Sequence, residues 1–489
     1  TSNIGELMII LGTNSIKDTG FDVDNSCRFN STSSDKLTRT FGSGGSVVKW
    51  TYSTWFKISY IGGNEQVFFS SFDNGDNYSY IKINGNNKLE FRAEASGSDV
   101  LRYTLTRRFR DPSAFMHLVV ALDSSLGTAG DRIKIWINGV RETVFDASTA
   151  PSQDATTLIN SAAAHEIGHA GDGSDFFNGY MSQVGFINNA QYDADQFGEF
   201  DEDSGIWKPI DISGLTFGQT RFYLDFEDSS ALGNDVSGNN NDFTANNLTA
   251  VDQSTDTCTN NWCVQNSISK PISGSPTFSQ GNLTIASGSG WKSTIGTFAL
   301  TKGKWYWETL GGGSAGTILN GIASTAVIEA GGASNGVNNN ATIGVNLPAY
   351  AYHGSSGAMY RSDTTGNGLD QGGGSWGTAY NTGDLISVYL DLDNYKLYTA
   401  KNNTLNVSGT GYSIASGYAY YPLCVPYTNT INLNYGIGAF GATAVSSAVA
   451  DANGYGAFEY DPSRGGSSDF DSTAKDFLAI CTKNLAEYG

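Results

Sequence analysis

Short runs in which apolar and polar residues alternate are the feature that most constrains this chain. They recur from about residue 26 onward, for example at 47–59, 78–83, 88–94, 116–123 and 131–139. Because successive side chains of a strand point to opposite faces, this period of two predicts half-buried β-strands. In the run 131–139, Ile133, Ile135 and Ile137 share one face, and Asn138-Gly139 predicts a hairpin turn.

Two further local expectations follow from the pattern between residues 178 and 200. The run 178–188 alternates again, which places Tyr180, Val184 and Phe186 on one face of a strand. A short helix is expected at 193–200, because Asp193 is a residue type that caps helix starts.

Composition bounds the fold class and the partners. The chain has 489 residues, too many for one hydrophobic core, and its 60 Gly, 26 Phe and 25 Tyr beside 9 Pro fit many short strands joined by tight turns. The net charge of −20 repels phosphate backbones and anionic lipid, so neither nucleic acid nor a membrane surface is expected as a partner. The alternative meaning of this charge is solubility at high local density.

Apolar runs stay below the ~18 residues of a membrane-spanning helix. The run Leu7–Leu11 lacks a basic leader and is interpreted as a first strand or a docking arm, rather than as an anchor or a signal peptide. Membrane insertion is therefore not expected.

The order of the runs between residues 20 and 200 resembles the laminin-G-like, concanavalin-A-like jelly roll. The stretches that carry the resemblance are 27-CRFNSTSSDKLTRTF-41, 50-WTYSTWFKIS-59, 111-DPSAFMHLVVALD-123, 133-IKIWINGV-140 and 178-NGYMSQVGFIN-188. A second region, about 281–440, resembles the SPRY domain, another β-sandwich. It carries 303-GKWYWETL-310, 383-GDLISVYLDLDNYKLYTAKNN-403 and 421-YPLCVPYTNTINLNYG-436, in which Asn434-Tyr435-Gly436 ends the last strand.

The resulting prediction is an all-β protein of tandem β-sandwiches. An N-terminal arm or first strand occupies 1–25, and the laminin-G-like jelly roll occupies 26–205. The stretch 206–280 is rich in Asn, Asp, Ser and Gly and is predicted to be a polar linker or decorated loop, because such a composition cannot bury a core of its own. The SPRY-like sandwich follows at 281–445 and a C-terminal extension at 446–489.

The two domains in this order resemble large structural proteins of marine tailed bacteriophages, and so do the segments 199–209, 222–244 and 479–485. The resemblance implies a non-enzymatic virion component on the particle surface, a fibre or a capsid decoration, that presents lectin-like domains to host surface glycans. Other virion proteins and further copies of this chain are then the expected protein partners. The alternatives are a secreted or surface carbohydrate-binding adhesin of a cell, a capsid-cementing protein without a ligand and, by fold analogy alone, a glycoside hydrolase.

His165-Glu166-x-x-His169 matches the zinc-binding pattern of metalloproteases, which requires a helix so that both imidazoles share one face. Gly168, Gly171 and Gly173 disfavour a helix, because each Gly costs ~1 kcal/mol relative to Ala. The third histidine of the extended motif is also absent, since Asp172 and Asp175 stand at the two further motif positions. The segment is therefore expected to be a strand with Ile167 buried, and zinc is not expected.

Catalysis has few other candidates. Paired carboxylates of a glucanase strand are approached only by Glu199, Asp201 and the residues up to Ser204, where the last carboxylate is missing, so a solvated acidic turn is expected instead. The four histidines, at positions 117, 165, 169 and 353, are far apart in sequence except for the pair already considered. No catalytic residue is assigned.

Calcium is a possible ligand, because hard cations favour Asp and Asn oxygens and laminin-G-like domains bind calcium at loop rims. The alternative is a polar turn network. The candidate ligands are Asp225, Asp228, Asp235, Asn239, Asn241 and Asp242.

Glycan binding is expected in the loop-rich stretch 346–382, because SPRY-like domains bind partners through loops of this region and aromatic rings stack on sugar faces. The alternative is that these rings bury themselves under the loops. The candidates are Tyr350, Tyr352, Tyr360, Trp376 and Tyr380.

Five cysteines are too few for a disulfide scaffold. Cys258 and Cys263 are close enough in sequence to close a small loop through a disulfide, and two thiols are the equal alternative. Cys27, Cys424 and Cys481 lie in apolar strand contexts and are expected in the core.

Overall fold

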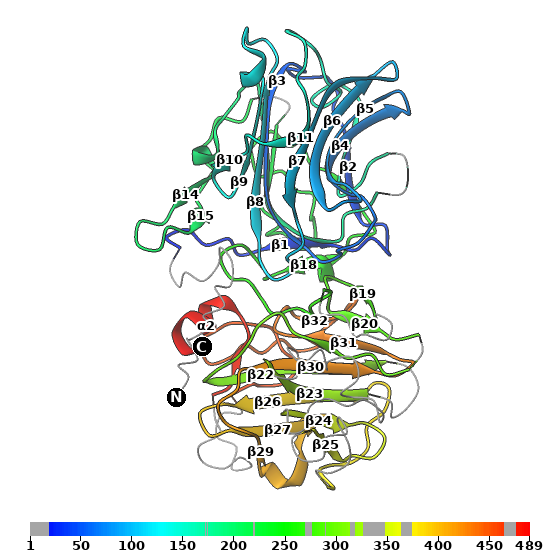
Figure 1. The fold of residues 1–489 in the computed structure, drawn as a ribbon, viewed down its shortest axis with the longest axis vertical. Helices are drawn as coiled ribbons and strands as arrows, with labels where there is room; N and C mark the ends of the chain where they lie inside the picture. Colours follow the sequence, from blue (N-terminus) through cyan, green and yellow to red (C-terminus); the bar gives the residue numbers. More distant parts are fainter. Residues whose placement is uncertain are drawn as a thin grey trace. The chain divides into compact units, whose positions relative to one another are not determined.

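The computed structural model describes residues 19–171, 173, 175–218, 221–268, 276–288, 290–312, 318–325, 348–362, 374–463 and 476–489. The chain forms two compact units, Asp18–Asn261 and Trp262–Gly489, named here the first and the second sandwich. Strands make up nearly all of the regular structure in both (Figure 1). Thr1–Asp18, which contain most of the predicted N-terminal arm, lie outside the described residues.

The first sandwich contains two eight-stranded sheets. Sheet A has the order β10-β9-β8-β3-β13-β1-β18, and β16 pairs with β13 beside this path. Its strands are β1 (Ser26–Phe29), β3 (Lys49–Ile58), β8 (Met116–Asp123), β9 (Ile133–Ile137), β10 (Val140–Arg141), β13 (Gly179–Asn188), β16 (Phe222–Leu224) and β18 (Gln253–Ser254).

Sheet B has the order β11-β7-β6-β5-β4-β12-β2-β17, and a separate hairpin pairs β14 with β15. The strands of sheet B are β2 (Lys36–Thr40), β4 (Gln66–Asn74), β5 (Asn77–Ile83), β6 (Lys88–Ala95), β7 (Ser98–Arg108), β11 (Phe145–Thr149), β12 (Ala164–Ile167) and β17 (Thr244–Asn246). The hairpin consists of β14 (Gly198–Phe200) and β15 (Trp207–Pro209).

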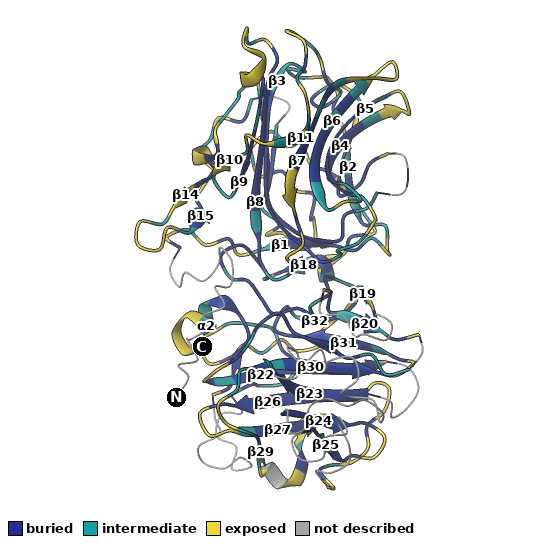
Figure 2. Ribbon diagram, in the orientation of Figure 1, coloured by how far each residue is buried: buried dark blue, intermediate teal, exposed yellow. Residues whose placement is uncertain are grey.

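Sheet A is apolar on both faces. One face packs on sheet B, where Tyr52, Phe56 and the predicted Ile133, Ile135 and Ile137 belong to one buried cluster. The other face belongs to a second buried cluster that contains Trp55, Val119, Trp136 and Tyr180, and residues between 194 and 223 cover it with Ala194, Phe197, Trp207, Ile212, Phe217 and Tyr223. Buried residues accordingly follow the strands of both sheets, whereas exposed residues gather in the connections (Figure 2).

The predicted polar linker at 206–280 is wrong for its first part. Residues up to 254 supply β15, β16, β17 and β18, and three of these strands pair with β13, β2 and β1 of the first sandwich. The boundary between the two units falls at Asn261–Trp262 instead. Single apolar residues such as Trp207 and Phe222 anchor this otherwise polar segment to the core.

Two local predictions between 178 and 200 are also corrected. A β-bulge between Ser182 and Gly185, with Gln183 at φ +48°, shifts the alternation of β13, so that Tyr180 faces away from the core that buries Val184 and Phe186. The predicted helix at 193–200 is only the 3-10 turn η3 (Ala194–Gln196), which leads into β14. Asp193 makes no capping hydrogen bond and pairs instead with Lys134 at 3.1 Å.

In its described residues, the second sandwich contains a nine-stranded and a five-stranded sheet. The nine-stranded sheet has the order β19-β20-β31-β22-β26-β27-β28, with β29 beside β27 and β34 beside β22. Its strands are β19 (Thr277–Ser279), β20 (Thr284–Ala286), β22 (Lys304–Gly312), β26 (Leu385–Asp391), β27 (Lys396–Lys401), β28 (Thr404–Leu405), β29 (Tyr412–Ser413), β31 (Thr430–Asn434) and β34 (Leu478–Ala479).

The five-stranded sheet has the order β21-β30-β23-β24-β25. Its strands are β21 (Thr294–Ile295), β23 (Ile318–Ser324), β24 (Ala349–His353), β25 (Met359–Arg361) and β30 (Tyr420–Pro426), and a further hairpin pairs β32 (Ala439–Phe440) with β33 (Thr443–Ala444). The remaining described elements are η2 (Ala129–Asp131), η4 (Ala250–Asp252), η6 (Asn406–Gly409) and the helix α2 (Thr482–Tyr488).

The predicted C-terminal extension at 446–489 is part of the second sandwich. β34 pairs in parallel with β22, and Phe458 and Phe477 are buried in the main core. Glu308 of β22 links this strand to the predicted extension, because its carboxylate accepts hydrogen bonds from the backbone N–H groups of Glu459 and Tyr460 at 2.9 and 2.8 Å. Burial raises the pKa of Glu308 to about 7.

The hairpin predicted at Asn138-Gly139 is confirmed, since both residues have positive φ (+50° and +75°) between β9 and β10. A Cβ atom at Gly139 would lie 2.3 Å from the Trp207 ring. Gly139→Ala is therefore expected to lower the free energy of unfolding by about 1–3 kcal/mol, measured by urea denaturation. Gly127→Ala, whose Cβ would meet nothing within 4 Å, is the matched control. Equal stability of the two variants would contradict the packing described here.

Candidate functional site

The His165-Glu166-x-x-His169 segment is a strand. Residues Ala164–Ile167 form β12, which pairs with β2 on one side and β4 on the other. Because successive side chains of a strand alternate, His165 and Glu166 point to opposite faces of sheet B. Gly168, at φ +84°, follows the strand, so His169 lies beyond its end. The expectation of a buried Ile167 is confirmed.

Both ring nitrogens of His165 are engaged within the fold. The backbone N–H of Asn160 donates to Nε2 at 2.9 Å, so the proton is on Nδ1, which donates to the carbonyl of Ala163 at 2.9 Å. Burial lowers the pKa of His165 to about 4. This neutral imidazole holds a loop against the core and has no lone pair directed at a metal.

Glu166 and His169 form a separate polar cluster with Lys36. The Nδ1–H of His169 donates to Glu166 Oε2 at 2.6 Å, and Lys36 Nζ contacts Oε1 of the same carboxylate at 2.9 Å. Burial alone would raise the pKa of Glu166, but the hydrogen bonds from His169 and Lys36 lower it below its usual value. Among the described residues, no three His, Cys, Asp or Glu side chains are grouped so as to hold a metal ion.

The candidate calcium ligands form a network of turns. Asp235 is buried and accepts hydrogen bonds from the backbone N–H groups of Tyr223, Ser237 and Asn241, and Asp242 accepts one from the N–H of Asp235. Asn241 bonds Arg39 and the carbonyl of Arg221. The same pattern continues at the remaining candidates, where Asp225, Asp228 and Asn239 bond Glu227, Ser230 and Ser237, respectively. The geometry agrees with the alternative of a polar turn network.

The acidic residues that approach a glucanase motif lie in and beside the β14–β15 hairpin. Glu199 and Asp201 both contact Lys208, at 3.3 and 3.4 Å, and Asp201 also accepts hydrogen bonds from Ser204. This is the solvated acidic turn that the sequence predicts.

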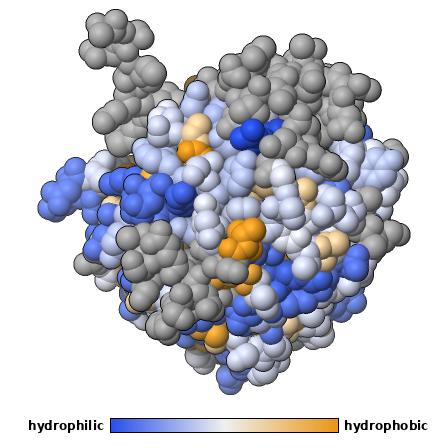
Figure 3. Space-filling model, turned by 90° about the horizontal axis from the view of Figure 1, so that it is seen from below, coloured by the Kyte–Doolittle hydropathy of each residue, from blue (hydrophilic) through white to orange (hydrophobic). Residues whose placement is uncertain are grey.

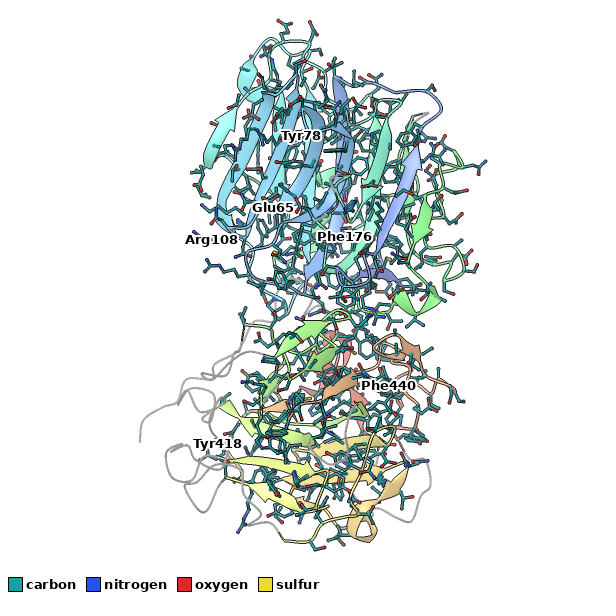
Figure 4. All side chains as sticks on the ribbon, turned by 90° about the vertical axis from the view of Figure 1, so that its right-hand side faces the viewer. Glu65, Tyr78, Arg108, Phe176, Tyr418 and Phe440 are labelled. Carbon is teal, nitrogen blue, oxygen red and sulfur yellow. The ribbon has the colours of Figure 1, made fainter. Side chains whose placement is uncertain are left out.

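The face of sheet B that points away from the main core carries a row of aromatic residues that includes Tyr78, whereas Phe176 lies in the loop before β13 (Figure 4). The rings of Phe72, Tyr78 and Tyr80 stack in a row, with centroid distances of 6.4 and 5.3 Å, and Arg92 lies over Tyr78 at 5.5 Å. Because each ring face is covered by its neighbour, this row stabilises the sheet and leaves little ring surface for a sugar.

Four of the five rings predicted to bind glycan are buried. Tyr350 and Tyr352 alternate with Ala349 and Ala351 along β24 and point into the main core of the second sandwich, where Trp376 and Tyr380 also lie. Their polar atoms are used internally: the Trp376 indole N–H donates to Thr399 at 2.7 Å, and the Tyr380 hydroxyl bonds the carbonyls of Ile318 and Tyr352. The expectation that these four rings stack on a sugar is therefore corrected.

Tyr360 is half-buried and belongs to an aromatic row on the opposite face of the five-stranded sheet. His353 stacks on Tyr360 at 4.4 Å, Trp291 lies 5.9 Å from His353, and Tyr427 lies 5.1 Å from Trp291. Tyr427 is 36% exposed. The sequence analysis missed Trp291 and Tyr427, because they come from loops far from 346–382 and only the sheet brings them to Tyr360.

A cavity of about 520 Å³ with a mixed polar and apolar lining opens in the second sandwich beside the predicted loop. Its volume is in the range of small-molecule sites. The lining combines two amides, two hydroxyls, an ammonium group and two aliphatic side chains, from Gly377, Thr378, Lys401, Asn402, Thr404, Leu405, Asn406 and Val407.

Hydrogen bonds beneath the cavity hold its wall in place. Asn406 and Trp376 both donate to the hydroxyl of Thr399 at 2.7 Å, while Lys401 Nζ is held by Asp384 at 3.0 Å and by the carbonyl of Ala379. Gly377 packs on Asn406 so closely that a Cβ atom there would lie 2.2 Å from its side chain.

The backbone of the cavity wall is unusual as well. Asn402 and Asn403, with φ of +46° and +66°, form the two-residue turn between β27 and β28, where positive φ is the rule, whereas Val407 lies outside this turn and has a φ of +44°. Positive φ is uncommon for a β-branched residue, and such conformations concentrate at functional sites. Val407 is 40% exposed, so burial of its side chain does not account for this conformation.

The large exposed apolar side chains are scattered over both sandwiches, for example Val140, Phe200, Ile268 and Val407. The face shown in Figure 3 is mainly hydrophilic, with hydrophobic colour confined to small separate areas.

The five cysteines are buried thiols. Cys258 packs in the cluster on the second face of sheet A, whereas Cys263 packs in the main core of the second sandwich. The two residues are therefore separate thiols, and the possible Cys258–Cys263 disulfide is not formed. Cys27, Cys424 and Cys481 lie in the cores, as predicted.

Residues 29–195 match the sequence model of the laminin-G type within the concanavalin A-like lectin/glucanases superfamily. The predicted all-β class with tandem sandwiches is confirmed, and the concanavalin A-like match lies within the first sandwich. No curated protein matches the chain. Among the described residues, no helix is long and apolar enough to cross a membrane.

Solved structures with similar folds include the heptameric pentraxin of Limulus polyphemus, at 13% identity, covering 35% of this chain and 80% of that chain with a TM-score of 0.27. The SPRY domain of human HERC1 has 14% identity, 31% and 87% coverage, and a TM-score of 0.23. A putative carbohydrate-binding protein of Bacteroides ovatus has 15% identity, 46% and 59% coverage, and a TM-score of 0.30.

The buried His165 makes stability depend on pH. Its pKa falls from 6.5 to about 4 on folding, so its contribution of about 3 kcal/mol is present above pH 6.5 and is lost as the pH falls towards 4. Urea denaturation across this interval is expected to show a smaller loss of stability in His165→Gln, which does not titrate. An identical pH dependence in the two proteins would contradict a neutral, buried His165.

Proposed function

We propose that this protein is a non-enzymatic glycan-binding protein and that the cavity of the second sandwich, with its mixed polar and apolar lining, holds the sugar. The composition of the cavity lining carries the proposal. Hydroxyl groups such as those of Thr378 and Thr404 bond sugar hydroxyls, and the methyl groups of Leu405 and Val407 face the apolar side of a sugar ring. Lys401 adds a cation that favours sugars with a carboxylate.

The match of residues 29–195, which lies in the first sandwich, supports carbohydrate binding by the protein, since the superfamily is named for lectins and glucanases. The absence of enzymatic activity is part of the proposal. It is supported by the carboxylates that came closest to catalytic motifs, because Glu166 is bonded by His169 and Lys36, and Glu199 and Asp201 contact Lys208.

We further propose that the protein is a structural and attachment component on a tailed-phage virion, a fibre or a capsid decoration. The support is the resemblance of both domains and their connecting segments to phage structural proteins. Rigid sandwiches suit the role, because many weak sugar contacts presented together give high avidity. The alternative role is that of a cellular adhesin with the same glycan site.

Glycan binding is tested on an array, with and without EDTA, followed by titration of the best ligand. Thr378→Ala and Thr404→Ala, which remove exposed hydroxyls of the cavity, are each expected to weaken binding about tenfold, the equivalent of one hydrogen bond. Thr404→Trp is expected to abolish binding by filling the cavity. Loss on addition of EDTA would show that a divalent cation takes part.

Tyr427→Ala is the matched control, because Tyr427 is exposed in the aromatic row and not in the cavity. Loss of binding in Tyr427→Ala alone would move the site to that row. An array without any bound glycan would contradict the proposal.

The virion role is tested by immunogold electron microscopy of purified particles with antibody to the second sandwich. Label at tail or fibre tips is expected for a receptor-binding component, and label over the head for a capsid decoration. Particles without label would contradict the virion role and favour the cellular adhesin.

A further inference from the structure

Lys57 is a lysine that is completely buried in the first sandwich. It lies in β3 on the face of sheet A that the segments after β13 cover, and its side chain has no exposed surface. The rings of Phe115 and Tyr180 flank its ammonium nitrogen at 5.4 and 5.2 Å. A lysine in such a position requires polar partners, because burial of an isolated charge is very costly.

Two side chains near the end of the first sandwich converge on Lys57. Asp256 Oδ2 lies 2.5 Å from Nζ, and its side chain is also fully buried. Asn261 Oδ1 accepts a hydrogen bond from Nζ at 2.8 Å, and Asn261 is 1% exposed. The amide nitrogen of Asn261 donates to the carbonyl of Ser113, which turns the side-chain carbonyl towards Lys57.

This arrangement unites a nucleophile, a carbonyl group and a proton carrier in a dry enclosure. We propose that Lys57 and Asn261 are joined by an intramolecular isopeptide bond, with Asp256 transferring the protons. Unlike a surface pair, an amine and a carboxylate in a low-dielectric interior exchange a proton readily to form a neutral pair, which gives Lys57 the lone pair that attack requires.

The step balances without any further reactant. Nζ of the neutral Lys57 attacks Cγ of Asn261, and the C–N bond to Nδ2 breaks. The protonated Asp256 delivers its proton to Nδ2 and takes one from Nζ, so that ammonia leaves and Asp256 returns to its protonated starting state. The products are one amide bond between the two side chains and one molecule of ammonia.

The distances suit this reaction. With a C=O bond of about 1.2 Å, a carbonyl oxygen 2.8 Å from Nζ places Cγ no more than about 4 Å from the nucleophile. Reacting atoms in productive complexes are about 3–3.5 Å apart, so only a small side-chain rotation is needed. The surrounding side chains hold the Lys57 amine and the Asn261 amide in a fixed relative orientation, which the same two groups would lack in solution.

Other lysine–carboxylate pairs of the first sandwich lack this combination. Lys49 pairs with Asp123 at 3.0 Å, but its side chain is 36% exposed. Lys82 contacts Glu65 and Asp175, two carboxylates, and Glu65 is 37% exposed. In these contacts both lysines face carboxylates, which are poor electrophiles, and neither lysine is paired with an amide carbonyl.

The position of the bond explains what it would do. Asn261 is the last residue of the first sandwich, and Trp262 begins the second. A covalent bond from Asn261 to β3 anchors the chain where it leaves the first sandwich and closes a loop from residue 57 to residue 261. Such a loop restricts the unfolded chain and resists a force that pulls on the second sandwich.

The intact, denatured full-length protein is weighed by mass spectrometry. The expected mass is lower than that of the sequence by one ammonia, and protease digestion is expected to release a branched peptide that contains Lys57 and Asn261. A mass equal to that of the sequence would overturn the proposal. Loss of one water, with Lys57 joined to Asp256, would overturn the assignment of Asn261 as the electrophile.

Variants separate the three roles. Lys57→Met and Asp256→Ala are expected to have the full mass of their sequences, whereas Asn261→Asp is expected to lose one water in place of ammonia. Lys49→Met, which removes another ion pair of β3, is the matched control and retains the loss of ammonia. Loss of ammonia in Lys57→Met would overturn the proposal, and the unmodified protein decides it even where a variant does not fold.

Discussion

The first sandwich depends on one constraint, which is that sheet A is apolar on both faces. In β3, Tyr52 and Phe56 pack on sheet B, while Trp55 points to the opposite side. A sheet of this kind needs a cover on each face, since exposed apolar area of this size is costly. The residues that follow β13 supply the second cover, which is why they belong to the first sandwich although their composition is that of a linker.

The sequence predicts strands well where the alternation is regular and fails where one residue changes the pattern. The hairpin at Asn138-Gly139 and the strand containing Ile167 follow from local physics, because a turn type and a period of two are visible in a few residues. Gln183 adds a bulge that moves Tyr180 to the other face, which no composition indicates. The packing of Trp207 on sheet A could not be predicted from the sequence either, since a single apolar residue among polar ones produces no hydrophobic periodicity.

The candidate site shows the same division. The loop-rich stretch that was expected to bind ligand does border the cavity through Gly377 and Thr378, but its rings point inward. Whether a ring in a strand faces the core or the solvent depends on the register, which pairs β24 with β23. The shape of the cavity wall depends on the backbone at Asn402 and Val407, which have positive φ, and on the hydrogen bond from Trp376 to Thr399. The spacing of residues in the sequence does not specify these features.

The buried lysine follows from the cover over sheet A. Lys57 lies on the same face of β3 as Trp55, and this face is covered. Because its side chain cannot reach solvent there, the covering segment has to supply polar partners for its amino group. That segment supplies Asp256 and Asn261. Asn261 is the last residue of the first sandwich, and Asp256 lies five residues before it. A polar contact at this place alone would open under load together with its cover, whereas an amide bond holds until a covalent bond breaks. Where the first sandwich is the anchored one, a pull on a glycan site of the second sandwich passes along the chain through Asn261. The proposed bond would then strengthen the connection that carries this load.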